Sequence, residues 1–241
     1  PGHFGAGIVF LPRNEAEREK CITCVESIIA EHGPESVALY SGTYALGPPV
    51  SMLTDSFMHA IGSRMSFGCG TIDQPGKIIA PALHGRWRGG EIAFGEADAW
   101  LFLGTNPMVS KLGGLPTINP GWHLTRAMKR GIQLIVIDPR RTETAELADI
   151  WLQVVPGTDA FVLAAMLGVL LEEDLVERPW LEAHAHDGEA LFRVLADVPI
   201  ALYCTRAGVD EAKVRKAARL IGGASSVSVL EDLGIEMAPH S

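Results

Sequence analysis

Two short apolar runs in this chain each end in residues that can hold a ligand. Residues 99–103 are followed by Gly-Thr-Asn-Pro at 104–107, and residues 132–137 are followed by Asp-Pro-Arg at 138–140. Runs that are short, bounded and aliphatic predict buried parallel strands. Ligands of a parallel sheet bind at the carboxyl ends of its strands, so these two turns are candidate binding elements.

The elements around the two turns predict a Rossmann-like βαβ unit. Residues 122–130 are long enough for a crossover helix that stops at Gly131. A further strand is expected at 151–155, followed by Pro-Gly-Thr-Asp at 156–159, where Thr158 and Asp159 are expected to cap a helix that runs through residue 171. The pattern indicates an α/β fold of parallel strands with flanking helices.

The rest of the chain predicts two parts of different character. Residues 1–97 contain an expected helix at 14–32, a strand at 36–40, a helix from Pro49, and a glycine-rich, loop-rich stretch from 62 to 97. Residues 98–241 hold the βαβ unit. Further helices are expected at 177–184, 189–196 and 209–221, and a last strand at 226–230.

Composition limits the classes of partner. The chain is 47% hydrophobic and 20% charged, which suits a globular enzyme. Its net charge of −9 argues against a nucleic-acid partner, since phosphate binding needs a positive field. No run approaches 18 apolar residues, so no membrane span is expected. The chain starts at Pro1 without a visible signal peptide, and the expected location is the cytoplasm, with the periplasm as the alternative.

Four segments, taken in order, resemble the molybdopterin oxidoreductase family of the dimethyl-sulfoxide-reductase and formate-dehydrogenase type. They are GTIDQPGKIIAPALHG at 70–85, GTNPMVS at 104–110, IDPRRTETAELAD at 137–149 and PGTDAFVLAAMLGVLLEEDLV at 156–176. The resemblance covers most of the chain and implies parts of two family domains. It implies that residues 62–97 include an active-site funnel and that residues 98–241 bind a dinucleotide.

The resemblance also implies a cofactor, molybdopterin guanine dinucleotide, which carries molybdenum or tungsten. Glycine lets backbone N–H groups approach a phosphate or pterin closely, and an arginine fork can pair with a phosphate. A carboxylate such as Asp159 can accept two N–H bonds from the edge of guanine. The candidate cofactor-binding residues are Gly104, Thr105, Asn106, Pro107, Asp138, Arg140, Gly157 and Asp159.

Two of these residues keep a structural alternative. Asp138 and Pro139 can form only a turn, and Asp159 can be only a helix cap. For Asp138 the binding roles are acceptance from a ribose hydroxyl or from guanine N–H groups. Within the ordered set of motifs, we expect the binding roles.

Candidates for catalysis are few. Many family members place a thiolate, selenolate or hydroxyl on the metal a few residues after an aspartate like Asp73, but residues 74–80 here contain none. We therefore expect no metal ligand from the protein, so that the cofactor and a water or oxo group hold the metal, or else a metal-free site. His84 is the acid–base candidate, with a loop anchor as the alternative. Cys69 is expected to be buried packing.

The cysteine and histidine pairs are expected to play no part in metal binding. Cys21 and Cys24 form a CxxC pair on a predicted helix, whereas a [4Fe–4S] cluster needs four thiolates. We expect the pair to be buried packing, with metal binding or a redox disulfide as the alternative, and any such cluster to lie in a part of the protein outside this sequence. The chain is accordingly expected to be a fragment of a larger protein. His184 and His186 are expected at the end of a surface helix.

The functional expectation follows from the resemblance. We expect the cofactor-binding part of a molybdenum- or tungsten-dependent oxidoreductase, which performs two-electron chemistry on a small molecule such as formate or an oxyanion. Its expected partner is an electron-transfer protein or an iron–sulfur domain. The alternative is a metal-free scaffold or electron-transfer complex subunit with the same fold.

Overall fold

The computed structural model describes residues 14–41, 48–68, 76, 79, 82–83, 96–110, 115–116 and 118–238. The chain forms two compact units, Pro1–Thr71 and Ile72–Ser241. The division expected from the sequence lies between a first α/β part at 1–97, which includes the funnel segment, and a dinucleotide-binding part at 98–241. It stays a prediction.

The first unit contains two longer helices and a pair of short parallel strands. The elements are α1 (Glu15–His32), η1 (Pro34–Ser36), β1 (Leu39–Ser41), α2 (Pro48–Ile61) and β2 (Ser66–Gly68), and β1 pairs with β2. Helix α1 begins where the Asn14 side chain accepts from the Glu17 N–H at 3.0 Å, and it ends at Gly33.

The expected burial of the CxxC pair is wrong. Cys21 and Cys24 are both exposed free thiols, and none of the residues of α1 is buried. The apolar residues of α1 do not gather into a stripe that could pack on a core, so this helix has no buried face for the pair to occupy.

The second unit is built on a four-stranded parallel sheet. Its strands are β3 (Ala99–Leu103), β4 (Gln133–Ile137), β5 (Ile150–Leu152) and β6 (Val227–Glu231), in the spatial order β5-β4-β3-β6. The expected α/β class is confirmed. The accompanying helices are α5 (Pro107–Ser110), α6 (Pro120–Lys129), η3 (Ala145–Leu147), α7 (Asp159–Glu172), α8 (Arg178–His184), α9 (Gly188–Ala196), α10 (Ile200–Ala207), α11 (Glu211–Gly223) and α12 (Leu233–Glu236).

Helix α10 was not expected from the sequence. Its residues include Ile, Tyr, Cys and Thr, which are weak helix formers. It forms against α7, where Cys204 and Ala207 are buried in the same core as Val162 and Ala165. Tertiary packing therefore decides this element. Among the described residues, no helix has both the length and the hydropathy needed to cross a bilayer.

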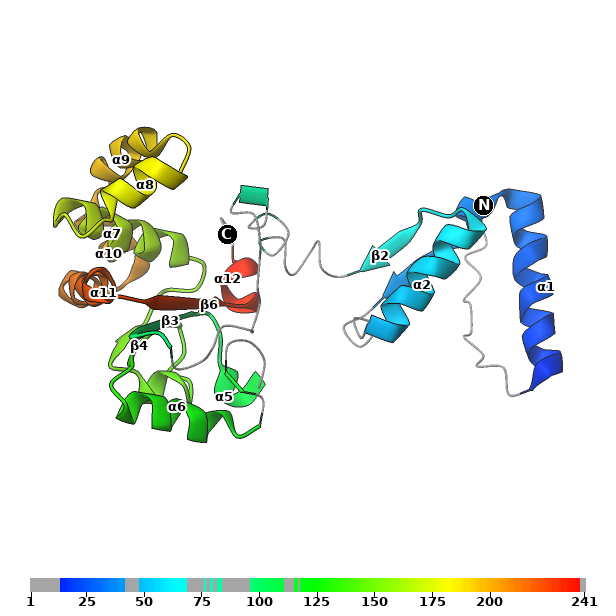
Figure 1. Cartoon of the computed structure of the whole chain (residues 1–241), viewed down its shortest axis with the longest axis horizontal. Helices are drawn as coiled ribbons and strands as arrows, with labels where there is room; N and C mark the ends of the chain where they lie inside the picture. The colour runs from blue at the N-terminus through cyan, green and yellow to red at the C-terminus, as the bar shows by residue number, and fades with distance from the viewer. Residues whose placement is uncertain are drawn as a thin grey trace. The chain divides into compact units, whose positions relative to one another are not determined.

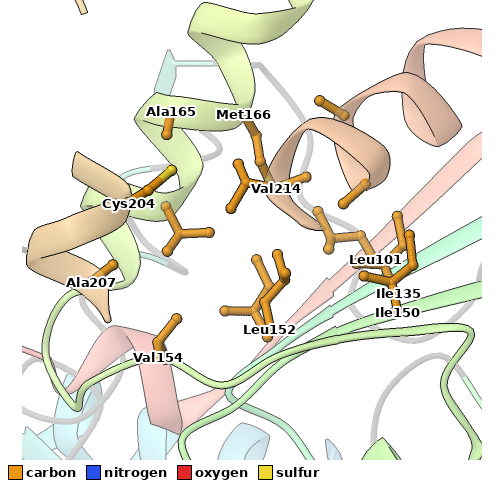
Figure 2. Close-up of a cluster of buried hydrophobic side chains, with 14 of the residues drawn as sticks. Leu101, Ile135, Ile150, Leu152, Val154, Ala165, Met166, Cys204, Ala207 and Val214 are labelled. Carbon is orange, nitrogen blue, oxygen red and sulfur yellow. The ribbon is translucent and has the colours of Figure 1, made fainter. Parts of the chain in front are cut away.

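Both faces of the sheet are covered, because alternate residues of each strand point to opposite sides. Figure 1 shows α6 on one side of the strands and α7, α10 and α11 on the other. Trp100 and Phe102 of β3 lie in the core beneath α6, whereas Leu101 lies in the core beneath α7. Figure 2 shows this second core, in which Leu101, Ile135, Ile150 and Leu152 face Ala165, Met166 and Val214.

The strand order places a topological switch point between β3 and β6. From β3 the chain proceeds through β4 to β5 on one side, and it then returns to add β6 on the other side of β3. In open parallel sheets, the crevice at the carboxyl ends of the strands at such a point is the usual place for a ligand. The two turns identified from the sequence lie at this edge, since Gly104 follows β3 and Asp138 follows β4.

Candidate functional site

A cavity of about 520 Å³ opens at the carboxyl edge of the sheet. Residues from the ends of all four strands line it, so the segment after each strand contributes to one site. The lining residues are Gly104, Asp138, Pro139, Pro156, Gly157, Asp159, Leu233, Gly234, Met237 and Ala238. The structure therefore brings together four of the eight residues that the sequence proposed for the cofactor: Gly104, Asp138, Gly157 and Asp159.

Side chains of β5 and the residue after it fix the turn that carries Asp138. The Trp151 indole N–H donates to the backbone carbonyl of Asp138 at 3.0 Å, and the Gln153 amide donates to that of Pro139 at 3.1 Å. The Arg140 backbone N–H donates to Asp138 Oδ1 at 2.8 Å. Asp138 thus forms a side-chain-stabilised turn and also lines the cavity, so the turn is compatible with the expected binding role, which stays a prediction.

Asp159 is the first residue of α7 and is buried, with 5% of its surface exposed. Gly157, with φ of +81°, turns the chain into this helix. The helix-capping residue is Thr158, but its hydroxyl donates to the Val155 carbonyl at 2.5 Å and caps no helix N–H. The expected capping by the Thr158 side chain is therefore wrong, because its hydroxyl bonds within the turn that precedes the helix.

The cavity places two carboxyl groups where ionisation is unfavourable. Burial raises the pKa of Asp138 above its ordinary value, against the opposing effects of the Arg140 N–H and charge. Burial also raises the pKa of Asp159, and the nearby negative charge of Asp138 raises it further. A ligand that presents N–H donors would relieve both effects, since hydrogen bonds favour the charged form of a carboxyl.

Asn106 and Arg140 lie outside the lining of the cavity and hold loops instead. The Asn106 amide donates to Glu143 Oε2 at 2.7 Å and accepts from the Thr144 hydroxyl at 2.7 Å. Glu143 also approaches Arg140, with an N–O distance of 3.6 Å. The turn after β3 and the loop after β4 are thereby joined. Any contact from Arg140 to a ligand would compete with this exposed ion pair.

Thr105 and Pro107 complete the turn after β3. Pro107 is buried and begins α5. Thr105 is buried too, and among the described residues its hydroxyl has no hydrogen-bond partner. An unpaired buried hydroxyl is costly, so this atom is suited to bond a group that the described residues do not supply.

The chain after β6 is the part of the site that the sequence reasoning missed. Leu233, Gly234 and Met237 belong to or follow α12 and line the cavity. The Gly234 N–H donates to the Gly104 carbonyl at 3.1 Å, and a Cβ on Gly234 would lie 2.3 Å from that oxygen. The available signal was a glycine three residues past the last strand, but its meaning depends on β6 lying beside β3.

The remaining candidates lie elsewhere. His84 and Cys69 fall outside the described residues, so their expected roles stay predictions. His184 is exposed at the end of α8, where it stacks on Trp180. Within the described ranges, no group of three or more His, Cys, Asp or Glu side chains is arranged to hold a metal ion.

Comparison with known proteins relates this architecture to a set of enzymes. Acetylene hydratase of Syntrophotalea acetylenica is 29% identical over 222 residues, which are 90% of this chain and 29% of that protein. Dimethyl sulfoxide reductase DmsA of Haemophilus influenzae is 32% identical over 65% of this chain and 20% of that protein. The solved acetylene hydratase from Pelobacter acetylenicus superimposes with a TM-score of 0.76 at 26% identity, covering 91% of this chain and 29% of that one.

The acetylene hydratase matches, by sequence and by structure, each cover about nine-tenths of the chain. The chain's relatives are enzymes of the molybdopterin oxidoreductase family. The F420-dependent formate dehydrogenase subunit alpha of Methanocaldococcus jannaschii is another relative, 28% identical over 60% of this chain. No family model matches the chain. The chain spans about three-tenths of the length of acetylene hydratase and one-fifth of the other two relatives named above.

The contact between Gly234 and Gly104 generates a prediction about stability. Gly234→Ala would place a methyl group against backbone atoms that cannot rotate away, and we expect the free energy of unfolding to fall by about 1–3 kcal/mol. Gly223→Ala is the matched control, since a Cβ there meets nothing within 4 Å at the end of α11. Urea unfolding of both variants is the measurement. Equal stability of the two would contradict the close contact.

Proposed function

We propose that this chain forms part of the cofactor site of a molybdenum- or tungsten-dependent oxidoreductase and binds the guanine end of a molybdopterin guanine dinucleotide. The observation that carries the proposal is the cavity at the β3–β6 switch point, lined by two buried carboxyl groups with raised pKa values. The likeness of the chain to molybdopterin enzymes supports the kind of cofactor.

The residues present fit the nucleotide end of this group. Guanine presents two adjacent N–H donors along one edge, and a carboxylate can accept both. Asp159 is the proposed acceptor for that edge, and Asp138 accepts from the ribose or a second base N–H. Gly157 permits close approach of a ligand to the backbone, while the unpaired Thr105 hydroxyl supplies a donor next to Gly104.

The chemical work is divided between protein and cofactor. When bound, the metal of the cofactor supplies two-electron redox chemistry or activates a water molecule. The described residues of this chain supply binding, orientation and exclusion of water. The proposed substrate is a small molecule, and an electron-transfer protein or iron–sulfur domain is the proposed partner for a redox reaction. Relatives named as formate dehydrogenases and dimethyl sulfoxide reductases support this choice.

Hydration is the second candidate, favoured by a specific observation. The acetylene hydratase match extends over 90% of the chain at 29% identity, whereas a formate dehydrogenase match of nearly the same extent, 88% of the chain, is 23% identical. Hydration of acetylene adds one water to give acetaldehyde and transfers no electrons to an acceptor. We therefore expect the protein that carries this sequence, if it is an oxidoreductase, either to reduce a redox dye with formate or to oxidise a reduced dye with an oxyanion or a sulfoxide. Acetaldehyde formation without any electron acceptor would instead support the hydratase.

The cofactor proposal predicts the nucleotide content of the purified protein. We expect GMP to be released on acid denaturation, together with bound molybdenum or tungsten. Asp159→Asn should reduce the retained GMP, because an amide replaces charge-assisted hydrogen bonds of roughly 1.5–3 kcal/mol each. The matched control is Asp197→Asn at the exposed end of α9. Chromatography of the released nucleotide and elemental analysis are the measurements.

Three outcomes of this experiment are informative. Loss of GMP in Asp159→Asn alone supports the base-reading role. Unchanged GMP in a folded Asp159→Asn protein would mean that Asp159 contributes only to the start of helix α7 and does not bind the base. A protein with neither metal nor GMP would favour the metal-free scaffold over the enzyme.

The raised pKa of Asp159 predicts a pH dependence of binding. The charged carboxylate is the form that accepts two N–H bonds, so the affinity of nucleotide-free protein for GDP should be full above the raised pKa. It should fall as the pH drops through that pKa, which lies above the ordinary 3.8. Affinity for ADP should lack this dependence. Titration calorimetry at several pH values is the measurement, and parallel curves for GDP and ADP would contradict the proposal.

The free energy of unfolding should depend on pH in the direction opposite to that of nucleotide affinity. Between the ordinary and the raised pKa values, the native state binds more protons than the unfolded state. The contribution of Asp138 and Asp159 to the unfolding free energy of nucleotide-free protein therefore rises as the pH falls through this window.

A further inference from the structure

Glu236, near the end of α12, makes a hydrogen bond across most of the second unit. Its side chain is buried, with 6% of the residue exposed, and its Oε2 accepts from the Gly76 backbone N–H at 3.0 Å. The two residues are 160 positions apart in sequence. A buried carboxylate is costly unless hydrogen bonds satisfy it, so this contact is part of what makes the position of Glu236 tolerable.

The helix that carries Glu236 is fixed to the cofactor-binding edge of the sheet. The Asp232 N–H donates to the Leu103 carbonyl at 3.3 Å, and the Gly234 N–H donates to the Gly104 carbonyl at 3.1 Å. The Asp232 side chain also accepts from the Leu233 N–H at 2.9 Å. These bonds hold α12 against the turn that follows β3, and Figure 1 shows α12 at the end of β6.

Gly76 is suited to receive this carboxylate. A Cβ at position 76 would lie 3.3 Å from Glu236 Oε2, which is tighter than an ordinary contact, and 3.5 Å from the carboxyl carbon, which is an ordinary contact distance. Glycine therefore allows the backbone N–H to come within hydrogen-bond range. Gly76 lies in the segment that is expected, from its resemblance to the family, to line an active-site funnel.

We propose that Glu236 is a positioning residue that holds the backbone at Gly76 in a fixed place relative to the nucleotide-binding edge. It acts through two links, the backbone bonds of α12 to the β3 turn and its own carboxylate bond to Gly76. Because Leu233 and Gly234 of the same short helix and Met237 just after it line the cavity, a nucleotide that fills the cavity also steadies α12 and, through Glu236, Gly76. This last step rests on the proposed function.

Hydrogen exchange at the Gly76 amide tests the contact directly in the protein that carries this sequence. Glu236→Ala removes the acceptor, whereas Glu236→Gln keeps an acceptor oxygen without the charge. We expect exchange at Gly76 to accelerate about tenfold or more in Glu236→Ala, and Glu236→Gln to restore most of the protection. Glu182→Ala, at an exposed position of α8, is the matched control and should leave exchange at Gly76 unchanged.

A second variant keeps the test decisive if Glu236→Ala does not fold. Gly76→Ala leaves Glu236 in place and crowds the contact. The amide at position 76 should therefore be less protected from exchange, relative to its intrinsic rate in an unstructured peptide, than the Gly76 amide in the Glu182→Ala control. Slow exchange in both Glu236→Ala and Gly76→Ala would overturn the proposed contact. Failure of Glu236→Gln to restore protection would likewise overturn the role of the acceptor oxygen.

Comparison of loaded and nucleotide-depleted protein separates this proposal from the proposed function. We expect bound nucleotide to slow exchange at Gly76 in the wild type and to have no such effect in Glu236→Ala. Equal exchange in loaded and depleted wild type, with GMP present, would overturn the link from the cavity to Gly76 while the proposed function stands. Absence of GMP would overturn the proposed function, and the exchange difference between Glu236→Ala and Glu236→Gln would still decide the contact.

Discussion

The pairing of β3 with a parallel strand on each side is the constraint on which the rest of the second unit depends. Every residue of β3 is buried, and its side chains alternate between the core beneath α6 and the core beneath α7. At roughly 1.5–3 kcal/mol for each large apolar side chain, burial on both faces fixes the register of the strand. Once the register is fixed, the turn at Gly104 can emerge only at one edge.

That edge collects the groups of the candidate site because parallel strands end on the same side. The turns after β3 and β4, the Pro-Gly-Thr-Asp turn after β5 and the short helix after β6 meet there. Two carboxyl groups are consequently buried near each other, and both pKa values rise. A folded chain that tolerates this arrangement is preorganised for a ligand rich in N–H donors, since the unfavourable burial of the two carboxyl groups takes place during folding and not during binding.

A second set of contacts keeps the turns in place around the cavity. Asn106 connects the β3 turn to Glu143 and Thr144, while Trp151 and Gln153 hold the Asp138 turn. The glycine contact between Gly104 and Gly234 brings α12 so close that no side chain fits between the backbones. Residues expected to contact a ligand and residues that position them are thus different sets, and Asn106 belongs with the second.

The sequence by itself determined the α/β class, the buried strands at 99–103 and 132–137, and the motifs that meet at the carboxyl edge. These follow from local periodicity and from turn residues whose conformational preferences act over a few positions. Only the tertiary structure decided that β6 pairs with β3, that α12 lines the cavity, that Glu236 reaches Gly76, and that Cys21 and Cys24 stay exposed. Each of these depends on segments far apart in the chain, whose contacts are set by which apolar surfaces remain to be covered once the local elements have formed.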